Sequence, residues 1–376
     1  MTMKRSAELV REGSTEVFVL QQKRSRKGPG ARLGEPFYNP AMELSRDLSV
    51  LVNQWFVRTR KESVCLLDGL GASGIRGVRY GHEIVGDFNV TINDSDVQAH
   101  SLIRKNIAHN ALKNVEASNK DLNVLLSENK FDSIDIDPFG SPVFFIDSAL
   151  RSIRHNGLLA CTATDTAPLC GVYPLVCLRR YGAWPFHSPM MHEIGLRILL
   201  GFLCREAGKF DKGIEPLLCH ASDYYFRVYV QVKKGKEAAN RSVEQLSCFS
   251  AKDLSAFSHR RVSDGTVGPL WMGKLQKRQV VEQVRSGVFE KQLNTKHELW
   301  KLVQTLEEEA GGPPFFYTME DVATKLKTSV PRREHFFDKL REEGFLVTRT
   351  HCTPTGFKTN ASFEEIKRVF RSVLVS

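Results

Sequence analysis

The stretch 63–233 alternates short β-branched apolar runs with longer runs of helical periodicity. This alternation is typical of a parallel β-sheet whose strands are connected by helices. Two more strands, 215–221 and 224–232, are expected to close the sheet as an antiparallel hairpin. The predicted fold is therefore α/β, with a Rossmann-like sheet that ends in an antiparallel hairpin. The other expected strands are 64–68, 90–93, 115–118, 133–136 and 158–164, and the expected helices are 75–85, 97–111, 144–153 and 192–210.

The rest of the chain divides around this sheet. With 376 residues, the chain has room for two or three domains of roughly 150 residues each. We expect an N-terminal basic segment at 1–62, the sheet domain at 63–235, a polar linker or excursion at 236–289 and a C-terminal domain at 290–376. In the last part, three helical patterns precede a short strand and a turn, which predicts a smaller, winged-helix-like α+β domain. A helical dimerisation domain is the alternative, although we expect a monomer.

Composition narrows the class of protein. The chain is 41% hydrophobic and 26% charged, without a run of ~20 apolar residues or an apolar leader, so we expect a cytoplasmic protein that does not enter a membrane. The net charge of +10 and a pI near 9.2 favour a polyanionic partner such as nucleic acid. One basic cluster contains Lys23, Arg24, Arg26, Lys27 and Arg32. The eight cysteines form no Cys-x-x-Cys pair, which argues against a metal knuckle.

A glycine-rich loop follows the first predicted strand. Asp68 precedes Gly69, Gly71 and Gly74 in a G-x-G-x-x-G pattern, which lets the backbone turn sharply and approach a ligand at a helix N-terminus. Asp94 follows the next strand, where a carboxylate can bind the ribose hydroxyls of an adenosine group. Together these features predict a cofactor that contains adenosine. The alternative is that the glycines serve close packing and that Asp94 caps the following helix.

The motif Asp137-Pro138-Phe139-Gly140 follows the strand predicted at 133–136, at the edge where open α/β sheets bind ligands. Hydride transfer has no use for this motif, but methyl transfer to the exocyclic amine of a nucleobase does. The Asp137 carboxylate and the Pro138 carbonyl can each accept an amine hydrogen and orient the nitrogen, while Phe139 stacks on the base. The alternative is a plain Asp-Pro turn at the end of a strand.

Longer motifs resemble one family. Over nearly its whole length the chain resembles the archaeal tRNA (guanine-26 N2)-dimethyltransferases, in Pro36-Phe37-Tyr38-Asn39-Pro40 and in the runs 68–77, 135–142, 163–171, 348–351 and 354–356. The resemblance implies a class I methyltransferase domain that uses S-adenosylmethionine, and a family-specific C-terminal domain. It also implies transfer of one or two methyl groups to the N2 amine of guanine 26 in tRNA.

The resemblance implies roles for individual residues as well. Arg46 and Arg76 would contact the cofactor, since arginine suits its carboxylate end. Asp94 would hold the ribose, and Asp121 with Leu122 would frame the adenine. The full set of expected cofactor residues is Arg46, Asp68, Gly69, Gly71, Gly74, Arg76, Asp94, Asp121 and Leu122.

For catalysis, the resemblance implies that Asp137 is the central residue and that Pro138 supplies its carbonyl. Phe37 and Phe139 would sandwich the flipped guanine. A core aromatic is the alternative for Phe37.

One segment departs from the family pattern. Some relatives carry paired Cys-x-x-Cys motifs for zinc shortly before a Gly-Pro-Leu-Trp segment; here Gly268-Pro269-Leu270-Trp271 is present, but only Cys248 and His259 lie upstream. Four ligands cannot be assembled from these residues, so we expect no structural zinc and no other metal. The basic residues expected to grip tRNA phosphates in the tail are Arg332, Arg333, Lys339, Arg349 and Lys358.

Three other functions stay open. An adenine-N6 methyltransferase of DNA or RNA would share the Asp-Pro-aromatic turn, although such enzymes generally have a second proline before the aromatic residue. A non-catalytic winged-helix nucleic-acid-binding protein would not need the glycine loop, Asp94 or Asp137. A nicotinamide dehydrogenase would not need the antiparallel hairpin.

Overall fold

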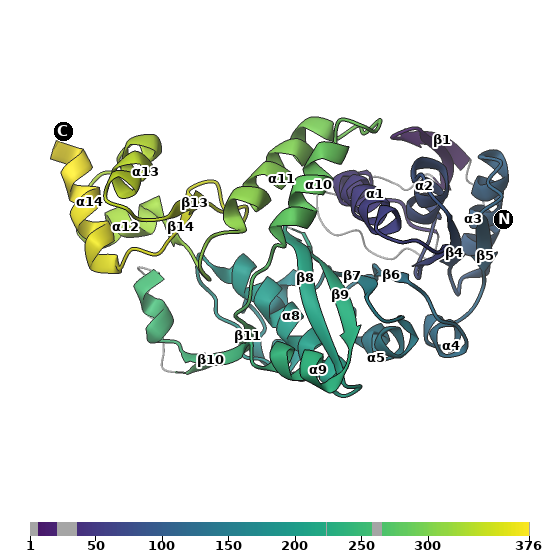
Figure 1. Ribbon diagram of the computed structural model, residues 1–376, viewed down its shortest axis with the longest axis horizontal. Helices are drawn as coiled ribbons and strands as arrows, with labels where there is room; N and C mark the ends of the chain where they lie inside the picture. Colours follow the sequence, from purple (N-terminus) through teal and green to yellow (C-terminus); the bar gives the residue numbers. More distant parts are fainter. Residues whose placement is uncertain (1–6, 21–35, 223, 258–264, 376) are drawn as a thin grey trace, which may run out of the picture.

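The computed structural model describes residues 7–20, 36–222, 224–257 and 265–375 (Figure 1). At its centre is a seven-stranded sheet in the order β5-β4-β3-β6-β7-β9-β8. Neighbouring strands pair in parallel except β9, which is antiparallel to both β7 and β8. The predicted α/β class and its closing antiparallel hairpin are therefore confirmed. The strands are β3 (Val64–Asp68), β4 (Phe88–Asn93), β5 (Val115–Ser118), β6 (Ser133–Ile136), β7 (Gly157–Ala163), β8 (Lys212–Ala221) and β9 (Phe226–Lys234).

Helices cover both faces of this sheet, and each face has its own hydrophobic cluster. Successive strand residues point to opposite faces, so Leu158 and Ala160 of β7 enter one cluster while Leu159 and Cys161 enter the other. The first face carries α1 (Glu43–Arg58), α2 (Ile75–Glu83) and α3 (Val97–His109), and the second carries α4 (Leu122–Glu128), α5 (Val143–Ser152) and α8 (Met191–Gly208).

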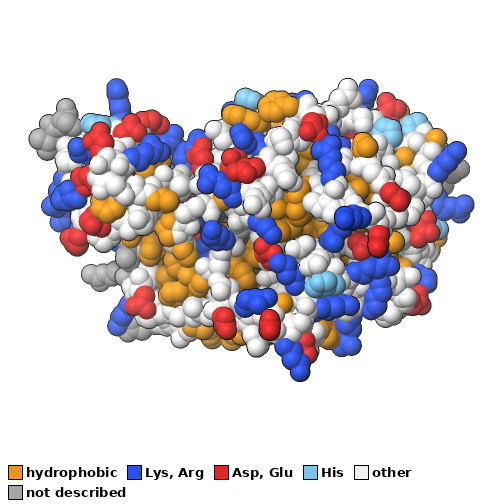
Figure 2. Space-filling model, viewed as in Figure 1, with side chains coloured by type: hydrophobic (Ala, Val, Ile, Leu, Met, Phe, Trp, Pro, Cys, Tyr) orange, Lys and Arg blue, Asp and Glu red, His pale blue; other side chains and the backbone are white. Residues whose placement is uncertain are grey.

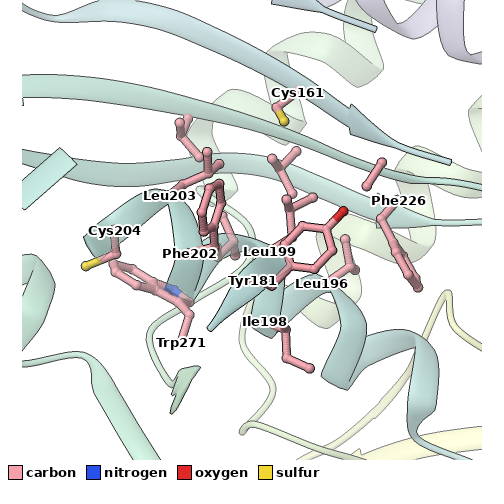
Figure 3. Close-up of a cluster of buried hydrophobic side chains, with 14 of the residues drawn as sticks. Cys161, Tyr181, Leu196, Ile198, Leu199, Phe202, Leu203, Cys204, Phe226 and Trp271 are labelled. Carbon is pink, nitrogen blue, oxygen red and sulfur yellow. The ribbon is translucent and has the colours of Figure 1, made fainter. Parts of the chain in front are cut away.

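The second face is built around α8. This helix is apolar on nearly every side, and such a helix must be covered on every side. Figure 3 shows Leu199 and Phe202 of α8 among Tyr181, Phe226 and Trp271, which come from three other elements. The helices α6 (Thr166–Leu169) and α7 (Pro174–Tyr181) follow β7 and lie against α8. The segment after β7 is therefore anchored in the core.

Two elements precede the sheet where our sequence analysis predicts only a basic segment. The strands β1 (Ala7–Glu12) and β2 (Thr15–Leu20) form an antiparallel hairpin that packs on α2 and α3, and α1 is buried along the sheet. A short hairpin gains its stability from such packing. The buried positions of α1 run almost without interruption and include polar residues, so this helix has no clear apolar periodicity either. The basic cluster at 23–32 lies outside the described residues.

Residues 236–289 contain several elements that pack on the sheet domain. The β10–β11 pair is antiparallel, β11 lies against α8, and α9 lies against β8. Within the described part of the chain, no group of three or more His, Cys, Asp or Glu side chains could hold a metal ion. His259 lies outside that part. The elements are α9 (Lys236–Val243), β10 (Leu246–Ser250), the 3-10 helix η2 (Asp253–Phe257), β11 (Thr266–Trp271) and α10 (Arg278–Gly287).

The C-terminal part begins with α11 (Lys296–Glu309), which packs against α1 and α10. Beyond it, β12 (Tyr317–Thr318), β13 (Val347–Arg349) and β14 (Gly356–Thr359) form a small antiparallel sheet in the order β12-β14-β13, with α12 (Met319–Leu326), α13 (Arg333–Glu342) and α14 (Phe363–Val375). These helices and strands form a separate lobe in Figure 1. The smaller α+β unit is present, and its winged-helix character stays a prediction. No helix among the residues described above is both long and apolar enough to cross a bilayer.

One residue of the tail is not where we expect it. Lys358 of β14 is only 2% exposed, and its Nζ lies 2.9 Å from Glu193 of α8 and 3.1 Å from Glu309 of α11. The prediction that Lys358 grips tRNA phosphates is therefore wrong, because the charge is neutralised inside the protein. It joins the C-terminal lobe to the sheet domain instead. Arg349 is partly exposed and pairs with Glu308 at 2.6 Å.

Candidate active site

The glycine loop connects β3 to α2 and is tightly constrained. Gly74 is the N-cap of α2 and has a φ of +78°, a conformation that glycine adopts without strain. A Cβ on Gly71 would lie 2.6 Å from Cγ2 of Ile92, so no side chain fits there. Gly71 lines the cavity described below, whereas Gly69 and Gly74 line neither cavity and shape the loop from behind.

Asp68 lies beneath this loop. Its carboxylate is buried and accepts a hydrogen bond from the Gly77 N–H at 2.9 Å. Burial raises the pKa of Asp68 to about 7, although the Arg76 guanidinium nearby opposes the increase. Asp68 therefore serves as a hydrogen-bond acceptor that anchors the first turn of α2.

Asp94 and Asp121 lie at the adenosine side of the expected site. The Asp94 carboxylate accepts hydrogen bonds from the N–H groups of Ala72 and Asp96, both at 2.9 Å. The residue that caps α3 is Asp96, which accepts bonds from the first turn of that helix, so the alternative role of Asp94 as the helix cap is wrong. Asp121 does cap a helix, α4, through its Oδ1. Both residues line the same cavity as Leu122.

Arg46 reaches the other side of the site from α1. Its Nε donates to Glu12 Oε2 at 2.7 Å, and its Nη2 contacts Glu12 and donates to the Asn39 carbonyl at 3.0 Å. Within the described residues, Nη1 has no hydrogen-bond partner. Burial opposes the charge of Glu12, but Arg46 and Arg79 outweigh it and hold the pKa of Glu12 below its usual value. Arg46 is thus held from behind, with one nitrogen left for a ligand.

Asp137 lies in the turn after β6 and forms an ion pair with Arg76. Arg76 is 5% exposed, and its Nη1 donates to Ser49 Oγ at 2.6 Å. Behind this pair, Asp135 is bound to Arg227 at 2.5 Å. Burial by itself raises the pKa of Asp135, but Arg227 and Arg76 outweigh it and hold that pKa below its usual value. The Asp137 carboxylate therefore has a cationic partner that is itself fixed in the core.

The other side of the turn is tied to the end of β7. The Thr164 Oγ1 accepts a hydrogen bond from the Gly140 N–H at 2.6 Å. The residues that follow Gly140 and Thr164 are also connected, through Tyr181. The Ser141 hydroxyl donates to Tyr181 Oη at 2.8 Å, and the Tyr181 hydroxyl donates to Asp165 at 2.5 Å. These bonds connect the Asp137 turn to the segment that is anchored against α8.

Phe37 and Phe139 lie in contact beside Asp137. Their ring centroids are 4.7 Å apart and their planes meet at 73°, an edge-to-face arrangement. A base sandwiched between two rings needs them roughly parallel and separated by its own thickness. At least one of the two rings therefore has to turn before a guanine fits between them. Phe37 is partly exposed, which argues against the alternative of a core aromatic.

Two cavities meet at the Asp137 turn. One has a volume of about 130 Å³ and is lined by residues that include Arg46, Asp68, Arg76, Thr164 and Tyr224. The other has a volume of about 330 Å³ and contains the adenosine-side carboxylates. A ligand that occupies both cavities therefore passes Asp137. The residues that line both are Phe37, Leu70, Ala72, Asp137, Pro138 and Phe139.

The sequence of the chain is similar to those of known proteins. The family model described as N2,N2-dimethylguanosine tRNA methyltransferase matches residues 31–371. The chain belongs to this family. The tRNA (guanine(26)-N(2))-dimethyltransferase of Methanobrevibacter smithii is 37% identical over 354 residues, which cover 90% of this chain and 91% of that protein. The enzyme of the same name from Thermococcus kodakarensis is 38% identical over an alignment of 385 residues, covering 97% of this chain and 99% of that protein.

A solved structure supports the fold of this N2,N2-dimethylguanosine tRNA methyltransferase family member. Trm1 from Pyrococcus horikoshii, in a complex with S-adenosyl-L-methionine, aligns with a TM-score of 0.84 and 32% identity, over 96% of this chain and 99% of that one. The family that our sequence analysis names from its motifs is therefore confirmed.

The family member also has site residues that sequence reasoning does not identify. They are Glu12, which holds Arg46, Thr164, which holds Gly140, and Tyr224, which lines the smaller cavity. Thr164 lies in a run that carries the family resemblance, so that run already contained a signal. Glu12 and Tyr224 lie in hairpins without a motif, and only the folded chain brings them to the site.

Proposed function

We propose that this protein transfers one or two methyl groups from S-adenosylmethionine to the exocyclic N2 of guanine 26 in tRNA. The observation that carries the proposal is the position of Asp137, where the two cavities meet and where Arg76 supports it. The names of the curated relatives support the same reaction. The net charge of +10 suits a polyanionic substrate.

The residues around the cavities have the chemistry that S-adenosylmethionine requires. When bound, this cofactor supplies a methyl group on a positively charged sulfur. We assign the ribose hydroxyls to Asp94, the adenine to Asp121 and Leu122, and the carboxylate of the methionine part to Arg46 through its Nη1. The absence of a side chain at Gly71 lets the backbone approach the ligand closely.

The guanine amine is oriented by two acceptors. The Asp137 carboxylate and the Pro138 carbonyl each accept one of its hydrogens, which directs the nitrogen toward the methyl group. Proline has no N–H and stiffens the turn that presents its carbonyl. Phe37 and Phe139 hold the base once their rings have separated. The amine loses its proton during or after transfer, to Asp137 or to water, and a second transfer uses the remaining N–H.

We further propose that the protein acts as a monomer in the cytoplasm, and light scattering of the purified chain tests the first point.

The reaction is tested by incubating the protein with labelled S-adenosylmethionine and unmodified tRNA, with duplex DNA as the comparison, and by identifying the labelled nucleoside after digestion. Methylated guanosine from tRNA is the expected product. Label found only in methyladenosine would overturn the proposal in favour of an adenine-N6 methyltransferase.

A further inference from the structure

Aromatic side chains surround the opening to the Asp137 turn. Phe139 is 50% exposed, Phe144 is 68% exposed and Tyr224 is 45% exposed. Phe144 lines the larger cavity and Tyr224 lines the smaller one, while Phe139 lines both. Single exposed aromatics are common on protein surfaces, but three that line two adjoining cavities indicate a binding site.

The two outer aromatics stand on opposite sides of the catalytic turn. Phe144 lies in the first turn of α5, directly after the Asp137 motif. Tyr224 lies in the connection between β8 and β9, next to the end of β7. Phe144 lines only the larger cavity and Tyr224 lines only the smaller one, so the two residues flank the part that the cavities share, which is the Asp137 turn with Phe37 and the loop around Leu70.

We propose that Phe144 and Tyr224 stack on the nucleobases that flank the target guanine in the RNA strand. This inference rests on the proposed function and extends it. A base that leaves its stack to reach an active site exposes the faces of its two neighbours, and aromatic side chains are the usual partners for such faces in RNA. Stacking uses the π face that every base has, so these contacts provide affinity for a distorted strand without reading its sequence.

The chemistry of the two residues fits this role and does not fit catalysis. Phe144 has no polar group, and Tyr224 contributes its ring whether or not its hydroxyl is used. Each side chain is largely exposed in the free protein, so it is available to a strand that arrives from solvent. Neither is needed for the hydrogen bonds that hold Asp137 in place.

The experiment compares Phe144→Ala and Tyr224→Ala with the wild type. A matched control is Phe289→Ala, because Phe289 is 64% exposed but lies in the connection between α10 and α11 and lines neither cavity. Each of the two test substitutions is expected to raise the Kd for unmodified tRNA about 5- to 100-fold, as loss of one stacked base does. Because the two residues also line the cavities assigned to the cofactor, the Kd for S-adenosylmethionine is measured in parallel, and it is expected to change much less than the Kd for tRNA. Tyr224→Phe should retain wild-type tRNA affinity.

A spectroscopic measurement makes the contact visible. Synthetic tRNA with 2-aminopurine next to the target guanine is expected to lose fluorescence when wild-type protein stacks on it, and Tyr224→Ala or Phe144→Ala should abolish the quenching on one side. If both variants bind tRNA like the Phe289 control, or if Phe144→Ala weakens S-adenosylmethionine instead, the inference is wrong. Failure of the wild type itself to bind or methylate tRNA would contradict the proposed function, which keeps the two failures distinct.

Discussion

Two hydrogen bonds connect Thr164, at the carboxyl end of β7, to Gly140, in the turn after β6. The Thr164 N–H donates to the Gly140 carbonyl at 2.9 Å, and the Gly140 N–H donates to Thr164 Oγ1 at 2.6 Å. Gly140 has a φ of +82° and follows Phe139 directly, so the conformation of the whole turn depends on this connection. Together with the Arg76–Asp137 ion pair, it fixes the turn from two sides.

Thr164→Val is expected to lower kcat about tenfold. The substitution keeps the shape of the side chain but removes the acceptor of the Gly140 N–H. Leaving this N–H without a partner costs about 1–3 kcal/mol, and we expect the turn to shift so that the N–H finds another acceptor. The Kd for S-adenosylmethionine should stay within twofold, and Thr164→Ser should restore most of the rate. Steady-state kinetics with saturating tRNA measure this; an unchanged kcat would show that the turn keeps its geometry without the hydroxyl.

Asp137→Asn is expected to lower kcat by at least about 100-fold, the range seen for loss of a positioned catalytic group. Asparagine keeps the shape of the side chain but removes the charge opposite Arg76 and one acceptor for the amine. The Kd for S-adenosylmethionine, measured by calorimetry, should change little. A variant with the wild-type rate would mean that the catalytic group lies elsewhere.

Glu12→Gln is expected to raise the KM for S-adenosylmethionine and to destabilise the fold. Glu12 is 1% exposed and holds Arg46, so the substitution leaves buried arginine charge uncompensated, which costs about 3–5 kcal/mol when a buried pair is broken. Glu8→Gln is the matched control, because Glu8 lies exposed on the same strand. Denaturant unfolding and cofactor titration of both variants test the role of the hairpin, and equal behaviour of the two would refute it.

With His220→Phe, the free energy of unfolding is expected to decrease less steeply as the pH falls than it does in the wild type. Burial, with the nearby His351 and Arg227, lowers the pKa of His220 from 6.5 to about 3. The unfolded chain therefore binds this proton more tightly, so the contribution is fully present above pH 6.5 and is lost as the pH falls toward 3, at up to about 1.4 kcal/mol per pH unit.

The free energy of unfolding, measured by denaturant between pH 4 and pH 7, tests this difference between His220→Phe and the wild type. His297→Phe provides the comparison at an exposed site on α11. Parallel pH profiles for the wild type and His220→Phe would contradict the assignment.

Much of the fold is predictable because its signals are local. The strands around Asp68 and Asp135 are short apolar runs bounded by motifs, and β3, β5 and β6 lie where the sequence pattern predicts them. The N-terminal hairpin and α1 are not predicted, because their stability comes from packing rather than from their own periodicity: the hairpin packs against α2 and α3, and α1 packs against α2, α10 and α11. The sequence pattern predicts that Lys358 is a surface cation. Only the tertiary structure shows that its ammonium group is buried between Glu193 and Glu309.

The sequence by itself determined the chemical types at the site: the glycine loop, the carboxylates of Asp94 and Asp137, and the family to which their motifs belong. These depend on residue identity and spacing, which a linear chain contains in full. The tertiary structure alone decided that Arg76 supports Asp137, that Glu12 orients Arg46, and that Phe144 and Tyr224 stand at one opening. The residues of these three pairs lie 61, 34 and 80 positions apart in the chain, and their proximity follows from packing of the whole sheet rather than from any local pattern.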